Sequence, residues 1–388
     1  MVLDGGDAAT AAGHPSLAEA LGAGLGAPDV RIDPHAAAVI PYSSGTSGTP
    51  KGVMLSQYNL VANVAQSSAF FGVTADDVLL AVLPFFHIYG LTVLLNLALG
   101  RRARLVTMPK FDLAEFLRIT QDHRCTYLFI APPIAVALAK HPLVDQYDVS
   151  SVTATLSGAA PLDGDLGHAV ARRLGCVMLQ GYGMTELSPV SHAIPRDGAE
   201  RVPLASVGYT VPNTECKLLD PATDEEIEVP AEGPSAPGQL LIRGPQVMLG
   251  YLNRPDATAA TLDPAGFLRT GDIATVTADG VVTIVDRLKE LIKYKGYQIA
   301  PAELEALLLT NPQIADAAVI GVHREDGEEV PKAFIVRQAG VEVGGEDVMA
   351  FVAGHVAPFK RIRYVEFVDV IPKSTSGKIL RRELRARA

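Results

Sequence analysis

The chain has few cysteines, no excess of positive charge and no targeting pattern at its start. Its three cysteines, Cys125, Cys176 and Cys216, lie far apart without metal-ligand spacing, which argues against a disulfide framework or a zinc site. The formal charge of −10 argues against general affinity for nucleic acid. Residues 1–20 lack the basic start and long apolar core of a signal peptide. We therefore expect a cytoplasmic protein that does not bind nucleic acid.

Residues 78–100 are apolar over a length that could cross a bilayer. Pro84, His87, Gly90 and Asn96 interrupt this stretch, and no anchoring pattern flanks it. We therefore predict a buried strand over 78–84, a turn over 85–90 and a buried helix over 91–100, in place of a membrane span.

The 388 residues are enough for two hydrophobic cores, so two domains are the natural expectation. Apolar strands alternate with helical patterns over residues 36–183, which predicts a largely parallel sheet covered on both faces. From Ser206 onward, short strands separated by Gly, Pro and Asp predict a small β-barrel or a distorted antiparallel sheet. We predict an α/β fold, with a large domain over residues 1–288 and a small α+β domain over 289–388.

The run "YSSGTSGTPKG" over residues 42–52 combines hydroxyls, glycines and one lysine between two apolar strands. Glycines allow backbone N–H groups to converge on anionic oxygens, so the run predicts a phosphate-binding loop. It does not fit the P-loop pattern G-x-x-x-x-G-K-[ST], because Pro50 replaces the second glycine and Gly52 follows the lysine. A mobile linker of similar composition is disfavoured because strands are predicted on both sides.

Four further stretches follow in order: "GYGMTE" (181–186), "TGD" (270–272), "DRLKELIKYKGYQ" (286–298) and "PKSTSGKILRREL" (372–384). With the first loop they resemble the motifs of the adenylate-forming superfamily, which contains acyl-CoA synthetases, adenylation domains of peptide synthetases and luciferases. The stretches "LPFFHIYGL", "SGAAPL" and "QGYGMTELSPV" resemble those of 4-coumarate–CoA ligases. One motif departs from that family, because "GQLLIRG" carries Gln239 where its members have glutamate.

The resemblance implies that ATP and Mg²⁺ bind here. Glu186 would hold Mg²⁺, a hard cation that takes oxygen ligands, and Thr185 would contact the α-phosphate. Tyr182 would offer its ring to the adenine, and Asp272 with Arg287 would bind the ribose. The full set of ATP-binding positions that the resemblance implies is Ser43, Ser44, Gly45, Thr46, Ser47, Gly48, Thr49, Lys51, Gly158, Ala159, Ala160, Gln180, Gly181, Tyr182, Gly183, Met184, Thr185, Asp272, Arg287 and Lys378.

The resemblance also implies which residues act on the acid and on coenzyme A. Lys378 would bridge the attacking carboxylate and the phosphate as charge builds in the transition state. His87 would line the acid site and move to admit CoA, in a position where amino-acid-activating relatives have aspartate. Lys289 would be the hinge of the small domain, and the turn with Lys295 and Gly296 would serve the CoA half-reaction. The remaining acid-site positions would be Tyr89, Gly181, Gly183, Pro189 and Val190.

The function expected from these motifs is an ATP-dependent acid–CoA ligase that forms an acyl-adenylate and pyrophosphate, then an acyl-CoA and AMP. Three alternatives stay open: a fatty-acyl–CoA synthetase, a ligase that loads a carrier protein, and an inactive module that only binds nucleotide. Family members carry a substantial segment before the phosphate loop, so we expect a portion of the large domain to be missing here and apolar surface to be exposed.

Overall fold

The computed structural model describes residues 19, 22–24, 26, 29–43, 50–295, 297–324, 327–374 and 377–387. The chain divides into two compact units, Met1–Ala36 and Ala37–Ala388. All helices and strands discussed below belong to the second unit.

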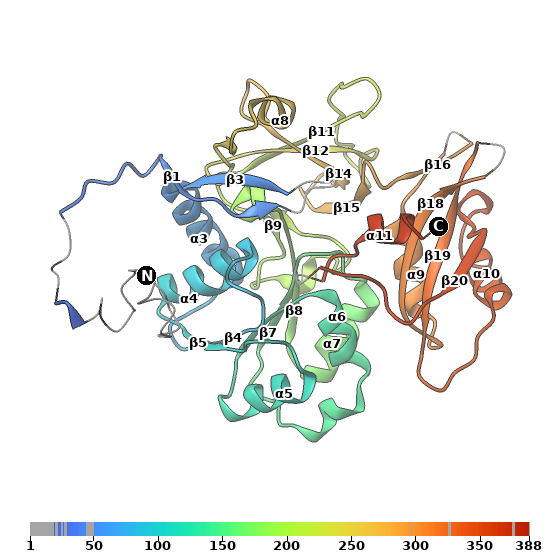
Figure 1. The fold of residues 1–388 in the computed structure, drawn as a ribbon, viewed down its shortest axis with the longest axis horizontal. Helices are drawn as coiled ribbons and strands as arrows, with labels where there is room; N and C mark the ends of the chain where they lie inside the picture. Colours follow the sequence, from blue (N-terminus) through green and yellow to red (C-terminus); the bar gives the residue numbers. More distant parts are fainter. Residues whose placement is uncertain are drawn as a thin grey trace. The chain divides into compact units, whose positions relative to one another are not determined.

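The largest sheet described has seven strands in the order β10-β9-β8-β7-β6-β4-β5 (Figure 1). The five strands from β8 to β5 are parallel, whereas β9 and β10 run antiparallel at one edge. Their bounds are β4 (Val78–Ala81), β5 (Arg104–Thr107), β6 (Tyr127–Ile130), β7 (Ala154–Ser157), β8 (Val177–Gly183), β9 (Val190–Ala193) and β10 (Tyr209–Thr210). The expectation of a largely parallel sheet is therefore confirmed, with an antiparallel edge that the sequence pattern did not indicate.

Helices lie between the parallel strands of this sheet, as crossover connections require, and one further helix precedes its first strand. They are α3 (Gln57–Phe71), α4 (Leu97–Arg101), α5 (Leu113–Asp122), α6 (Pro132–Lys140) and α7 (Gly164–Leu174), with short turns η2 (Pro142–Gln146), η3 (Thr185–Leu187) and η4 (Ala199–Arg201). Between β4 and α4 the chain forms a π-helix, η1 (Tyr89–Asn96). Residues 78–100 are thus a strand, a turn and a helix, and none of the helices described is long and apolar enough to cross a membrane.

Helix α3 begins directly after Ser56, which caps it. The Ser56 side chain accepts a hydrogen bond from the Asn59 N–H, and the Asn59 side chain accepts one from the Ser56 N–H. This reciprocal capping box satisfies two donors that a helix start leaves unpaired. The Asn59 amide also donates to the carbonyls of Pro245 and Val247, so the cap fixes the helix against the segment over residues 245–247.

Residues 215–287 form antiparallel sheets, one of which also includes the strands that precede α3. In the described residues, β11 (Glu215–Leu219), β12 (Gly238–Arg243), β14 (Leu268–Val276) and β15 (Val282–Arg287) make a four-stranded sheet with register shifts. This matches the distorted antiparallel sheet rather than the small barrel of the two predicted forms. A second sheet joins β1 (Ala37–Val39), β2 (Tyr42–Ser43), β3 (Lys51–Ser56) and β13 (Gly250–Tyr251), and α8 spans Pro255–Thr261.

The last hundred residues have the α+β composition predicted from their pattern. A hairpin of β16 (Ile292–Tyr294) and β17 (Tyr297–Ile299) precedes α9 (Pro301–Thr310). The strands β18 (Ile314–His323), β19 (Glu329–Arg337) and β20 (Tyr364–Phe367) form a sheet with α10 (Gly345–Ala353), η5 (Pro358–Lys360) and α11 (Arg381–Arg385). This part has its own buried core, which includes Leu304, Val319 and Ile335. The domain boundary at residues 288 and 289 stays a prediction.

Candidate active site

The predicted phosphate loop connects two paired strands. Strand β2 pairs with β3, and Ser43 lies opposite Lys51 in the register. The buried Ser43 hydroxyl has no hydrogen-bond partner among the described residues. Residues 44–49, which include the predicted ligands Ser44, Gly45, Thr46, Ser47, Gly48 and Thr49, lie outside the described residues.

A lysine, a tyrosine and a carboxylate meet beside this loop. The Lys51 ammonium lies 4.2 Å from the centre of the Tyr251 ring. The Tyr251 hydroxyl donates to Glu186 Oε1 at 2.8 Å, and Glu186 is buried. Thr185 precedes Glu186 at the start of η3 and is half-buried. The structure therefore brings the predicted phosphate ligand Lys51 and the predicted metal ligand Glu186 onto the same tyrosine.

The predicted nucleoside-binding residues also meet. The Tyr182 hydroxyl donates to Asp272 Oδ2 at 2.5 Å, and Arg287 Nε lies 3.5 Å from Asp272 Oδ1. Burial raises the pKa of the Asp272 carboxyl, while Arg287, the Tyr182 hydrogen bond and Lys378 oppose that rise. Strand pairing places Asp272 of β14 opposite Arg287 of β15, so the ion pair follows from the register.

Small residues allow close packing around the predicted acid site. An added Cβ on Gly158 would lie 2.9 Å from the ring of Tyr89, and one on Gly183 would lie 2.1 Å from the carbonyl oxygen of Pro189. Tyr89 is buried, and this burial raises the pKa of its hydroxyl. Val190 is buried, whereas Gly181 is half-buried. Ala159 follows Gly158 with a left-handed backbone (φ 72°), and Ala160 comes next.

The carboxy-terminal loop reaches this same region. An added Cβ on Gly377 would lie 3.2 Å from Ala131 Cβ and 3.4 Å from Pro133 Cδ at the start of α6. Burial and the charge of Arg287 lower the pKa of Lys378 to about 8, while Asp272 and Glu290 act in the opposite direction. Lys378 therefore lies among the ribose-site residues, although it is far from them in the sequence.

His87 belongs to the same group of residues. Its Nδ1 accepts a hydrogen bond from the Tyr89 N–H at 3.3 Å, and the side chain is half-buried. Burial, followed by the positive charge of Lys378, lowers the pKa of His87. The neutral imidazole is thus favoured where Lys378 supplies the cation.

Three predicted residues have other surroundings. The Gln180 side chain bonds to backbone groups of Leu162 and Leu204, so its polar atoms serve the packing of the sheet. Met184 is half-buried and packs against the core that includes Leu187. Lys295 is exposed on the β16–β17 turn, with its ammonium 5.4 Å from the Tyr294 ring centre, and no contact described joins it to Lys378.

Two predicted residues, Lys289 and Gly296, lie in the segment between β15 and β17. Lys289 is exposed in the turn that follows β15, and its role as a hinge stays a prediction. Gly296, predicted on the CoA side, lies outside the described residues.

Tyr251 is the residue that reasoning from the sequence missed. It links Lys51 and Glu186, and its burial raises the pKa of its hydroxyl. No local signal in "LGYLNRP" marks it, because its contact with Lys51 arises from the pairing of two strands that are far apart in the sequence. Strand β13 pairs with β3, which places Tyr251 opposite Val53.

Comparison with known sequences identifies the class of enzyme to which this fold belongs. The AMP-binding enzyme family matches residues 2–252, and the AMP-binding enzyme C-terminal domain matches residues 303–378. The chain therefore belongs to the AMP-binding enzyme family.

Within this family, the chain is similar to individual curated proteins. The chain is 48% identical over 367 residues to 4-coumarate–CoA ligase 1 of Solanum tuberosum, covering 93% of this chain and 66% of that protein. It is 47% identical over 367 residues to 4-coumarate–CoA ligase 2 of Nicotiana tabacum, covering 93% of this chain and 67% of that protein. The chain thus spans about two thirds of the length of the curated relatives that it matches.

Solved structures share the fold. ATP-bound MatB from Rhodopseudomonas palustris has a TM-score of 0.83 at 32% identity, covering 92% of this chain and 69% of that one. The anthranilate CoA ligase AuaEII in complex with anthranoyl-AMP has a TM-score of 0.81 at 26% identity, covering 90% of this chain and 67% of that one. The α/β architecture of a large part followed by a small carboxy-terminal part is therefore confirmed.

Proposed function

We propose that the chain carries the chemistry of an ATP-dependent acid–CoA ligase. In the first step the acid's carboxylate attacks the α-phosphorus of ATP, which gives an acyl-adenylate and releases pyrophosphate. In the second step the CoA thiol attacks the acyl carbonyl and displaces AMP, which gives the thioester. The observation that carries this proposal is the position of Lys378 beside Asp272, Arg287 and His87.

Lys378 is suited to the first step by charge and position. Asp272 and Arg287 would hold the ribose, and Tyr182 would be fixed beside it by its hydrogen bond to Asp272. A lysine at that place would neutralise the negative charge that builds as two anions approach each other. Because the fold holds Lys378, Asp272 and Arg287 in place before the substrates react, the entropic cost of adenylation is lower.

The donor set also fits Mg²⁺ near the phosphate loop. Glu186 is a buried carboxylate, and Ser43 beside the loop keeps a buried hydroxyl without a partner among the described residues. Glu186 would hold the ion, with Tyr251 fixing its orientation and Lys51 supplying a second positive charge. When bound, Mg²⁺ would neutralise phosphate charge and favour departure of pyrophosphate.

We further propose an aromatic acid of the hydroxycinnamate type as substrate. The support is the resemblance to 4-coumarate–CoA ligases, together with half-buried His87 where amino-acid-activating enzymes need a carboxylate. The three free cysteines fit a reducing compartment such as the cytoplasm.

The test measures pyrophosphate release with a panel of cinnamic, benzoic, medium-chain and malonic acids, with and without CoA. We expect release to depend on 4-coumarate and to yield a thioester when CoA is added. Release that is independent of every acid would overturn the proposal. Adenylate formation followed by transfer only to a carrier protein would assign the chain to the carrier-loading alternative.

The variant Lys378→Ala separates the two half-reactions. We expect its adenylation rate to fall by about 100-fold or more, since one transition-state charge contact is worth that much. Thioester formation from supplied coumaroyl-adenylate and CoA should stay close to the unmodified rate. Equal loss in both assays would contradict the role of Lys378.

A further inference from the structure

Helix α9 contacts charged residues at both of its ends. These residues belong to the large part of the chain, taken here as the described residues up to 288, whereas α9 belongs to the small part that follows. The first residues of the helix contact Asp286 of β15, and its last turn contacts Lys140 of α6. Both contacts join residues before the predicted hinge at Lys289 to a helix that follows it. They therefore depend on how the small part is oriented.

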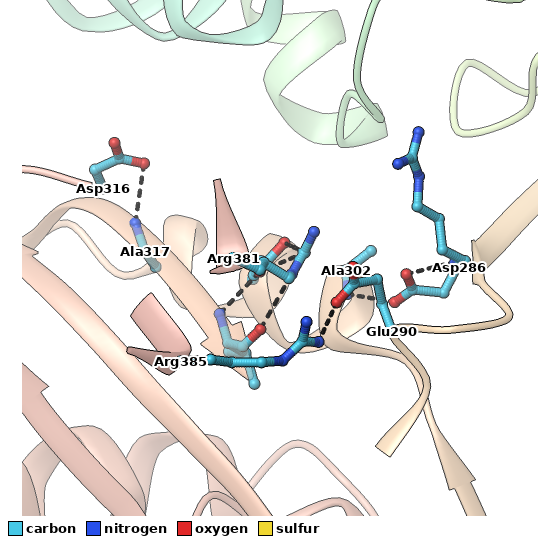
Figure 2. Close-up of polar contacts among 10 residues, drawn as sticks. Asp286, Glu290, Ala302, Asp316, Ala317, Arg381 and Arg385 are labelled. Carbon is cyan, nitrogen blue, oxygen red and sulfur yellow. Dashed lines mark hydrogen bonds and ion pairs between the residues drawn. The ribbon is translucent and has the colours of Figure 1, made fainter. Parts of the chain in front are cut away.

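The amino-terminal contact compensates for a missing cap. Ala300 precedes the helix and offers no side-chain acceptor, and Pro301 has no N–H group. The first free backbone donor is the Ala302 N–H, which donates to Asp286 Oδ2 at 2.9 Å (Figure 2). A carboxylate here also opposes the positive end of the helix dipole. Asp286 thus supplies the cap that α9 does not encode itself.

The carboxy-terminal contact has the opposite charge, as the dipole requires. Lys140 ends α6 and donates from Nζ to the carbonyl oxygen of Leu309 at 3.2 Å. Leu309 lies in the last turn of α9, where carbonyl groups lack helical partners. A cation at this end and an anion at the other match both poles of the dipole.

Helix α9 is rigidly joined to the loop that carries Lys378. Glu305 of α9 accepts hydrogen bonds from Arg381 Nη2 at 2.6 Å to each carboxylate oxygen, and both side chains are largely buried. Glu305 also accepts from the Val319 N–H at 2.8 Å, and Arg385 pairs with Glu290 (Figure 2). Arg381 begins α11 three positions after Lys378. A force that orients α9 therefore orients the Lys378 loop.

We propose that Asp286 and Lys140 are positioning residues that form an electrostatic clamp on α9. The clamp holds the small part in the orientation that places Lys378 at the adenylation site. Release of both contacts must precede any rotation about Lys289, because a turning helix would carry Ala302 and Leu309 away from their partners. The clamp thereby sets the balance between adenylation and thioester formation, an inference that rests on the proposed function.

The kinetic test compares Lys140→Ala, Asp286→Asn and the double variant with Lys110→Ala, which removes another exposed lysine of the large part. Adenylation is followed by pyrophosphate release, and the second step by thioester formation from supplied coumaroyl-adenylate. The ratio of the pyrophosphate-release rate to the thioester-formation rate should fall by about two- to fivefold for Lys140→Ala. This is the usual effect of a charge at a helix end. Asp286→Asn removes the charge but keeps an acceptor for the Ala302 N–H, so it should lower this ratio by about two- to fivefold as well.

The two effects should multiply in the double variant if the contacts act independently at the two helix ends. The KM values for ATP and acid should stay unchanged for Lys140→Ala, since Lys140 contacts no predicted substrate residue. They are read from that variant alone, because Asp286 Oδ1 also accepts the N–H of Arg287 at 2.6 Å, beside the predicted ribose site. A purely structural role would lower both half-reactions together and would lower the thermal midpoint. Equal changes in both rates, or no change in either, would overturn the clamp.

A distance measurement tests the clamp independently of catalysis. Spin labels are placed at Ser150→Cys and Glu346→Cys, two exposed positions in the large and small parts, after alanine replaces the three native cysteines. We expect one narrow distance population with the clamp intact and a second population in the double variant. An unchanged distribution would refute the clamp, and absence of adenylation by the unmodified chain would instead refute the proposed function.

Discussion

The position of Lys378 in the fold changes the pKa of its side chain. In the sequence it is one of several basic residues near the end of the chain. In the fold it is half-buried near Arg287, and the pKa falls to about 8 from an ordinary value of about 10.4. The charge that the proposed adenylation step needs is therefore close to its titration point in the free protein.

This pKa predicts the pH dependence of adenylation. A lysine is cationic below its pKa, so raising the pH through about 8 removes the charge. The value of kcat/KM for pyrophosphate release, which reports the free enzyme, should be constant below this pH and fall about tenfold per pH unit above it. The measurement is a rate profile from pH 6.5 to about 10 in buffers of constant ionic strength.

The variant Lys378→Arg is the matched control for that profile. Arginine stays charged throughout this range, so the decline above pH 8 should disappear even if the absolute rate is lower. The same decline in both proteins would assign the titration to another group.

At the scale of single elements, close backbone contacts shape the site. Strands β8 and β9 meet where Gly183 approaches Pro189, and the Met184 N–H donates to the Pro189 carbonyl at 3.0 Å. Any side chain at Gly183 would collide with backbone rather than with a flexible neighbour. The turn that positions Thr185 and Glu186 therefore requires glycine for reasons of space.

We predict that Gly183→Ala destabilises the fold by about 3 kcal/mol, a large overpacking cost. The added Cβ would lie 2.1 Å from a backbone oxygen, which cannot move without breaking the strand pairing. Urea denaturation followed by circular dichroism measures the change.

Gly175→Ala serves as the comparison for Gly183→Ala. Gly175 ends α7 with φ 66° and has open space around its Cβ position, so only the left-handed backbone costs about 1 kcal/mol. A cost for Gly183→Ala no larger than that of Gly175→Ala would contradict the steric argument.

At the scale of the whole molecule, one predicted hinge divides two half-reactions. Lys289 is exposed directly after β15, while the neighbouring Asp286, Arg287 and Glu290 are all engaged. In the described orientation Lys378 interacts electrostatically with Asp272 and Arg287, while Lys295 is exposed on its hairpin. If the proposed roles of these lysines hold, this orientation suits adenylation and the CoA step requires a rearrangement.

We predict that Lys289→Pro impairs the second step and spares the first. Proline restricts φ to about −65° and also limits the residue before it, which opposes rotation at this point. Thioester formation from supplied acyl-adenylate should fall by about tenfold or more, while acid-dependent pyrophosphate release stays near its original rate. Equal loss of both rates would place the hinge elsewhere.

Much of the fold was predictable because local patterns and packing agree. The apolar runs of β6 and β7 are buried, as the prediction of a sheet covered on both faces requires. The π-helix, the antiparallel edge formed by β9 and β10 and the added strand β14 were not predicted. Strands β9 and β14 each pair with a strand that is adjacent in the sequence, but strand propensity gives neither the partner nor the direction of pairing.

The sequence by itself determined the order of the motifs, the exclusion of the P-loop at Pro50 and Gly52, and the set of side chains able to perform the chemistry. The first two follow from residue type and spacing, and the third is what the resemblance of the motifs to a known superfamily implies. Only the tertiary structure brought Tyr251 between Lys51 and Glu186, and Lys378 beside Asp272. It also placed Asp286 and Lys140 at the two ends of α9. The reason is that hydrogen bonds and charge interactions act over a few ångströms in space, whatever the separation along the chain.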